Sequence, residues 1–173
     1  MTRQTPAAAF EFAFARVQSE YEELTDSWRQ VDSKAQTCAA IAGIFIAAAF
    51  AFVRNSALTL SLCEKLFLLL LVLVLILSIV MSIQAMLLRR VPVPPTPENI
   101  AQMVSELLET AEEEHEERHG ALVADTINAW IPVNRQLRAD LADKAGRLVT
   151  AQRLLLVAAI LMALLTVVAV VLH

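Results

Sequence analysis

Three long stretches of this chain carry no charged residue, and Lys or Arg flanks their ends. They are residues 35–53, 66–88 and 154–172, with lengths of 19, 23 and 19 residues. An α-helix rises about 1.5 Å per residue and the hydrocarbon core of a bilayer is roughly 30 Å thick, so about 20 apolar residues cross it. The sequence therefore predicts three transmembrane helices in a lipid bilayer, and a short external turn at 54–65 joins the first two.

The composition excludes several classes of function. Of the 173 residues 57% are hydrophobic, and the mean hydropathy is +0.58, which few soluble domains reach. Roughly 110 residues remain outside the predicted spans, too few for a large catalytic domain. The net charge of −4 argues against non-specific binding to nucleic acid. No Walker loop, dinucleotide fingerprint, nucleophile elbow or metal-spaced Cys pair occurs. We expect no enzyme, no cofactor and no nucleic-acid partner.

The distribution of Lys and Arg predicts the orientation in the membrane. Residues 1–34 contain four of these residues and residues 89–153 contain eight, whereas the turn at 54–65 contains two. Cytoplasmic segments carry an excess of Lys and Arg. The N-terminus and residues 89–153 are therefore expected on the cytoplasmic side, and the turn and the C-terminus on the external side.

The N-terminal segment 1–34 is predicted to be an amphipathic helix. Residues 7–34 lack Gly and Pro, and their apolar residues follow heptad spacing. These residues are Phe10, Phe14, Val17, Tyr21, Leu24, Trp28 and Val31. We interpret this stripe as the face that packs against other cytoplasmic helices; the alternative is self-association of several copies. The helix either continues straight into the first span or bends at the membrane surface.

The segment 89–153 is predicted to be a helical hairpin that follows a Pro-rich connector at 91–97. Gly120 is the expected C-cap of its first helix, and Pro132 is expected to kink or restart the second. An apolar stripe then leads into the third span. The expected fold class is an all-α membrane protein, with three transmembrane helices and a cytoplasmic helical bundle.

Small residues recur at every fourth position of the first span. They are Ala39, Gly43, Ala47 and Ala51. This spacing places them on one helix face, where another backbone can approach closely. We therefore predict that this face packs against another helix of the membrane.

Two polar motifs in the hairpin have simple explanations. His115 to His119 matches the H-E-x-x-H pattern of zinc proteases, but Glu117 and Arg118 occupy its inner positions and no third ligand follows. We interpret it as a chance match on a charged helix face and expect no metal site. The seven glutamates between 106 and 117 are interpreted as a solvated helix end, the alternative being a docking surface for a basic partner.

Cationic and aromatic residues of the predicted cytoplasmic bundle are candidates for contact with an anionic ligand. The positive-inside bias already accounts for the cations, but Arg also presents a fork of donors that matches phosphate. The candidate phosphate contacts are Lys34, Arg135, Arg138, Lys144 and Arg147. Trp28 or Trp130 is the candidate for contact with a base. The sequence alone does not bring these groups into one pocket.

Two entries into apolar spans carry a resemblance to a known family. VDSKAQ at 31–36 precedes IAGIFI at 41–46, and Asp143-Lys144-Ala145 precedes the last span in the same way. Together with Asn134, Leu148 and Ala151, these residues resemble the membrane effectors of bacterial Pycsar anti-phage systems. The resemblance covers most of residues 28–172 and implies no catalytic residue.

The resemblance implies a function in abortive infection. In such systems a neighbouring pyrimidine cyclase makes cyclic CMP or cyclic UMP, and the effector senses it and disrupts the inner membrane of the infected cell. The expectation is a homo-oligomeric, multi-pass protein of the bacterial inner membrane. A structural or adaptor membrane protein that recruits a cytoplasmic partner is the alternative.

Overall fold

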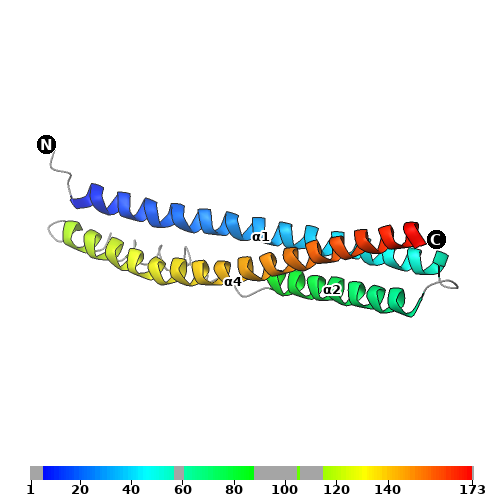
Figure 1. Ribbon diagram of the computed structural model, residues 1–173. Coiled ribbons are helices and arrows are strands. Elements are labelled where there is room, and N and C mark those ends of the chain that lie inside the picture. Colours follow the sequence, from blue (N-terminus) through cyan, green and yellow to red (C-terminus); the bar gives the residue numbers. More distant parts are fainter. Residues whose placement is uncertain (1–5, 57–60, 88–104, 106–114, 173) are drawn as a thin grey trace. The chain divides into compact units, whose positions relative to one another are not determined.

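Three long α-helices make up the described part of this chain (Figure 1). The structure, a computed structural model, describes residues 6–56, 61–87, 105 and 115–172. The helices are α1 (Pro6–Ser56), α2 (Leu62–Met86) and α4 (His115–Leu172), and no strand occurs among the described residues. Each of the three is long and apolar enough to cross a membrane. The all-α fold class with three candidate spans is thereby confirmed.

The helix α1 joins the predicted amphipathic segment and the first span without interruption. Between residues 7 and 42 the sequence contains neither Gly nor Pro, so nothing in its local chemistry ends the helix before the apolar stretch. The buried side chains keep the same heptad register across this boundary. They are Trp28, Ala35, Cys38, Ala42 and Ala49. Of the two predicted alternatives, the continuous helix is the one observed.

The helix α2 begins four residues before the predicted span because a capping box starts it. The Ser61 hydroxyl accepts a hydrogen bond from the Glu64 backbone N–H at 3.3 Å, and the Glu64 carboxylate accepts one from the Ser61 backbone N–H at 2.7 Å. These two bonds satisfy N–H groups that the first turn of a helix leaves without an intrahelical partner. Farther along, Leu71, Leu75 and Ser78 are buried at heptad spacing.

The helix α4 corrects the prediction for Gly120 and removes one of the two alternatives for Pro132. Gly120 was expected to end a helix, but α4 begins at His115 and includes it, and no glycine in the described chain has the positive φ of a C-cap. Pro132 lies inside α4, so the predicted restart does not occur. A proline removes one N–H donor and costs a helix about 3 kcal/mol. Trp130, Asn134 and Leu137 are buried around Pro132, and their packing offsets that cost.

The chain divides into two compact units, and α1 and α4 contribute to both. The head unit comprises residues 1–28 and 88–141, and the span unit comprises residues 29–87 and 142–173. The Pro-rich connector lies outside the described residues, as do the side chains of the acidic run and of the H-E-x-x-H motif. Among the described side chains no group of three or more His, Cys, Asp or Glu is suitably placed for a metal ion.

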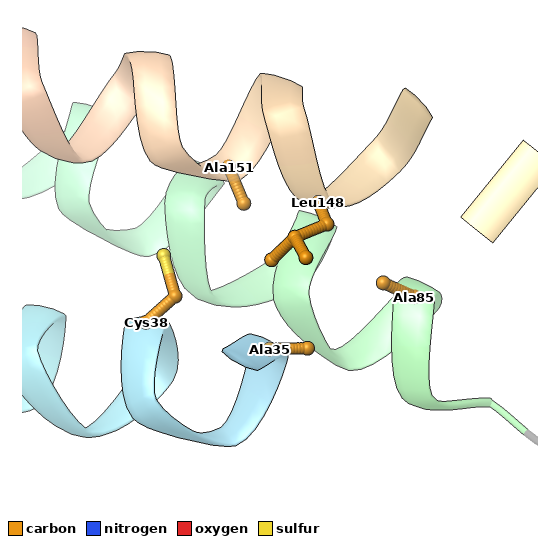
Figure 2. Close-up of a cluster of buried hydrophobic side chains, with 5 residues drawn as sticks. All are labelled: Ala35, Cys38, Ala85, Leu148 and Ala151. Atoms are coloured by element: carbon orange, nitrogen blue, oxygen red, sulfur yellow. The ribbon is translucent and has the colours of Figure 1, made fainter. Parts of the chain in front are cut away.

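The core of the span unit consists mostly of small side chains from all three helices. One cluster contains Ala35 and Cys38 of α1, Ala85 of α2, and Leu148 and Ala151 of α4 (Figure 2). Small side chains allow close approach of helix backbones, which is the main source of packing energy in a bilayer.

A hydrogen bond between two helices lies inside this core. The Ser78 hydroxyl, fully buried, donates a hydrogen bond to the Ala151 backbone carbonyl at 2.8 Å and lies 3.9 Å from the Cys38 sulfur. It links α2 to α4 at a depth where water is scarce, and interhelical bonds of this kind contribute about 0.6 kcal/mol on average.

The face of α1 that packs within the chain differs from the predicted small-residue face. Ala42 and Ala49 are buried, whereas Gly43 and Ala47 are exposed, as is Ala51. The reason is that the buried face of α1 keeps the heptad register of its N-terminal part, with alternating spacings of three and four residues. A row of residues spaced by four each time therefore moves gradually away from this buried face. The predicted face thus stays a prediction only for contacts between chains.

We expect Gly43→Ile to leave the folding of the single chain unchanged. A Cβ added at Gly43 meets no atom within 4 Å, so the larger side chain enters open space on the membrane-facing side. Thermal unfolding followed by circular dichroism in detergent measures this. The matched control is Ala42→Ile, which overfills the buried core and should lower the melting temperature. Equal destabilisation by both variants would contradict the observed register.

Candidate functional site

In the head unit, the heptad face of α1 packs against a second heptad face on α4. The rings of Phe14 and Tyr21 meet Trp130 edge to face, with centroid distances of 6.1 and 5.4 Å. One and two turns later on α4, Asn134 contacts Val17 and Arg138 contacts Glu20. The contacts ascend along both helices, so α1 and α4 run parallel in this unit.

A cavity of about 270 Å³ lies between these two faces. Its walls come from two residues of α1 and four residues of α4. They are Val17, Glu20, Ile131, Asn134, Arg135 and Arg138. Sites for small molecules usually measure roughly 300–1,000 Å³, and this cavity lies slightly below that range, so it suits a small ligand.

Asn134 places an unpartnered hydrogen-bond acceptor at the cavity. Its Nδ2 donates a hydrogen bond to the Val17 backbone carbonyl at 3.0 Å, which fixes the orientation of the amide. The residue is only 4% exposed, and its buried Oδ1 has no hydrogen-bond partner. A buried acceptor without a partner costs about 1–3 kcal/mol. A ligand N–H or O–H donor that moves the covering side chains aside and reaches this oxygen would remove that cost.

The two arginines of the cavity differ in their surroundings. Arg138 forms an ion pair with Glu20, and its side chain is 69% exposed, so the pair contributes little stability. Arg135 is exposed, and none of the described carboxylates forms an ion pair with it. Arg135 thus keeps its donor fork available for an anionic group at the cavity mouth.

The remaining predicted ligand residues lie elsewhere. In the span unit the Lys144 ammonium contacts the Asp32 carboxylate at 2.6 Å, and the Arg147 guanidinium contacts the Asp143 carboxylate at 3.0 Å. Lys34 also belongs to the span unit, where it lines a different groove. Trp28 is buried in the head unit. Of the seven predicted residues, Arg135 and Arg138 line one cavity, whereas Trp130 belongs to the aromatic contact with Phe14 and Tyr21 and does not line it.

Four residues of this site were not predicted as ligand contacts: Val17, Glu20, Ile131 and Asn134. The position of Asn134 carries a usable signal, because it lies four residues after Trp130 and three before Leu137. An amide at a core position of a heptad usually has a specific partner, as Asn134 has in the Val17 carbonyl.

Comparisons with protein-family models, curated proteins and solved structures found no match to this chain.

Proposed function

We propose that this chain is a membrane effector of a bacterial abortive-infection system that a cyclic pyrimidine nucleotide activates. The observation that carries the proposal is the cavity of the head unit, which is lined by Arg135 and by Asn134, whose buried Oδ1 has no hydrogen-bond partner. The resemblance of the span entries to Pycsar effectors gives the class of ligand, and the three apolar helices support a target in the bilayer.

Cyclic CMP and cyclic UMP both match the chemistry of this cavity. Each carries one phosphate with a single negative charge, which suits the exposed guanidinium of Arg135. Each also carries hydrogen-bond donors that suit Asn134 Oδ1: the exocyclic amine of cytosine, the imide N–H of uracil, and the ribose hydroxyl. A mononucleotide is the appropriate size for about 270 Å³, whereas larger cyclic oligonucleotides are not.

The proposed response follows from the continuity of α1 and α4. Both helices carry cavity residues in the head unit and then extend into the span unit. A ligand that binds between them stabilises one pairing of these helices, and allosteric couplings of about 1–3 kcal/mol are typical. We place the head unit in the cytoplasm, as the Lys and Arg distribution predicts, and we propose that several copies act together on the inner membrane.

The test combines binding with membrane leakage. Purified full-length protein in liposomes of phosphatidylethanolamine and phosphatidylglycerol should release an entrapped dye after addition of cyclic CMP or cyclic UMP, and cyclic AMP should have little effect. Calorimetry in nanodiscs should show one nucleotide per chain. Absence of binding to every cyclic nucleotide would remove the sensing half of the proposal.

Arg135→Gln and Asn134→Leu are the informative variants. Because a hydrogen bond to a charged group contributes about 1.5–3 kcal/mol, Arg135→Gln should weaken nucleotide binding by about tenfold or more. Asn134→Leu keeps the branched shape with the same number of heavy atoms and removes the unpartnered acceptor, so it should weaken binding while the fold is retained. The control is Arg147→Gln, since Arg147 lies outside the cavity and contacts Asp143. Equal affinity of all three variants would contradict the assignment of this cavity.

A further inference from the structure

A groove lies between α1 and α4 in the span unit. It measures about 440 Å³, and no residue of α2 lines it. Its lining changes along the helices from polar to apolar. Lys34 and Gln152 lie at one end, and Phe45, Leu156 and Ala159 extend it into the spans.

The length of this groove matches one leaflet of a bilayer. Lys34 and Phe45 are 11 positions apart on one continuous helix, which corresponds to about 16 Å. Half of the hydrocarbon core of a bilayer is about 15 Å. Leu156 is 62% exposed, so the groove is accessible from the side, where acyl chains surround a transmembrane helix.

The polar end of the groove carries an uncompensated positive charge. Lys34 is exposed, and none of the described carboxylates forms an ion pair with it, whereas nearby Lys144 and Arg147 each have one. Gln152 adds an exposed amide at the same end. A lysine at the membrane boundary attracts the phosphate of anionic lipids.

We propose that this groove binds one anionic phospholipid, with its headgroup phosphate at Lys34 and one acyl chain along Phe45, Leu156 and Ala159. A soluble anion satisfies the lysine but leaves the apolar walls uncovered. A neutral apolar molecule covers the walls but leaves the charge unpaired. A lipid that carries both groups satisfies the whole groove. The inference does not depend on the nucleotide cavity, which is built from other residues.

Native mass spectrometry of the full-length protein in detergent tests this inference. Phosphatidylglycerol and phosphatidylcholine are titrated separately, and the affinity for the first bound lipid is measured. Lys34→Gln should weaken phosphatidylglycerol binding by about fivefold, the effect of one lysine near a lipid surface, and should weaken phosphatidylcholine binding less, because the choline cation compensates its phosphate. The charge control is Lys65→Gln, because Lys65 is exposed and does not line the groove.

Ala159→Trp tests the apolar part, because its side chain fills the groove and should weaken the first binding of both lipids. Its control is Ala163→Trp, on the exposed part of α4 outside the groove. Should Ala159→Trp fail to fold, Lys34→Gln still decides the question, since Lys34 is exposed and its replacement removes no packing. The inference is overturned when Lys34→Gln and Lys65→Gln bind phosphatidylglycerol equally, or when free glycerol phosphate displaces the lipid from the wild-type protein.

Discussion

Asp32→Asn is expected to lower the free energy of unfolding by about 3 kcal/mol. Its carboxylate contacts the Lys144 ammonium at 2.6 Å, and the Lys144 side chain is only 6% exposed. The substitution removes the negative charge that compensates a nearly buried positive one. The estimate is at the low end for broken buried pairs, because the Asp32 side chain is 30% exposed and water reaches it. Reversible unfolding in mixed detergent micelles, followed by circular dichroism, measures the change.

A double-mutant cycle shows whether the loss comes from this pair. Lys144→Met keeps the long apolar stem, and the double variant with Asp32→Asn should be more stable than Asp32→Asn alone, because no buried charge is left. The matched control is Asp143→Asn. Asp143 pairs with Arg147 on the exposed surface of α4, the helix that carries Lys144, and such a pair contributes about 0.5 kcal/mol. Similar losses in Asp32→Asn and Asp143→Asn would show that burial of Lys144 is unimportant.

The sequence was sufficient to predict the all-α class and the three candidate membrane spans, because long runs of apolar residues indicate an apolar solvent around the helix. It also predicted the packing face of the N-terminal part of α1. Every described member of its N-terminal heptad stripe, from Phe14 to Val31, is buried or half-buried. A stripe of aromatic and branched residues in a charged helix has no other favourable position in water, so its burial follows from the hydrophobic effect alone.

The packing face of α4 was harder to predict because polar residues occupy two of its heptad positions. The buried seam contains Trp130, Asn134, Leu137, Lys144 and Leu148. A search for apolar periodicity passes over Asn134 and Lys144 and shifts the stripe toward its neighbours. Both residues are compatible with the core only because α1 supplies a partner, the Val17 carbonyl and the Asp32 carboxylate respectively. Such complementarity requires the pairing of two distant helices to be known.

The cavity of the head unit could not be predicted for the same reason. Its walls bring together residues more than 100 positions apart, as the separation of 117 positions between Val17 and Asn134 shows. Composition indicates that arginines are abundant near the membrane. It does not indicate that Arg138 pairs with Glu20 while Arg135 stays available. The packing face of an apolar span is also hard to predict. Both faces of the first span carry alanines, and only the register of α1 decides which of these alanines are buried.

Trp130→Ala is expected to lower the free energy of unfolding by about 3–5 kcal/mol, the usual effect of removing a buried indole. Trp130 is 8% exposed and meets Phe14 and Tyr21 with interplanar angles of 85° and 86°. Trp130→Phe keeps one aromatic ring in this cluster and should cost about 1–2 kcal/mol. The same micelle unfolding experiment measures both variants, with Phe12→Ala as the exposed aromatic control.

The pair of variants also separates packing from ligand contact. An indole that stacks on a base needs an accessible ring face, whereas the Trp130 ring is enclosed by α1 side chains in the head unit. We therefore expect Trp130→Phe to bind cyclic nucleotide as the wild type does, while Arg135→Gln loses affinity without loss of stability. A Trp130→Phe variant that is stable but no longer binds nucleotide would place the base against the indole, and the ligand would then have to displace Phe14 or Tyr21 on entry.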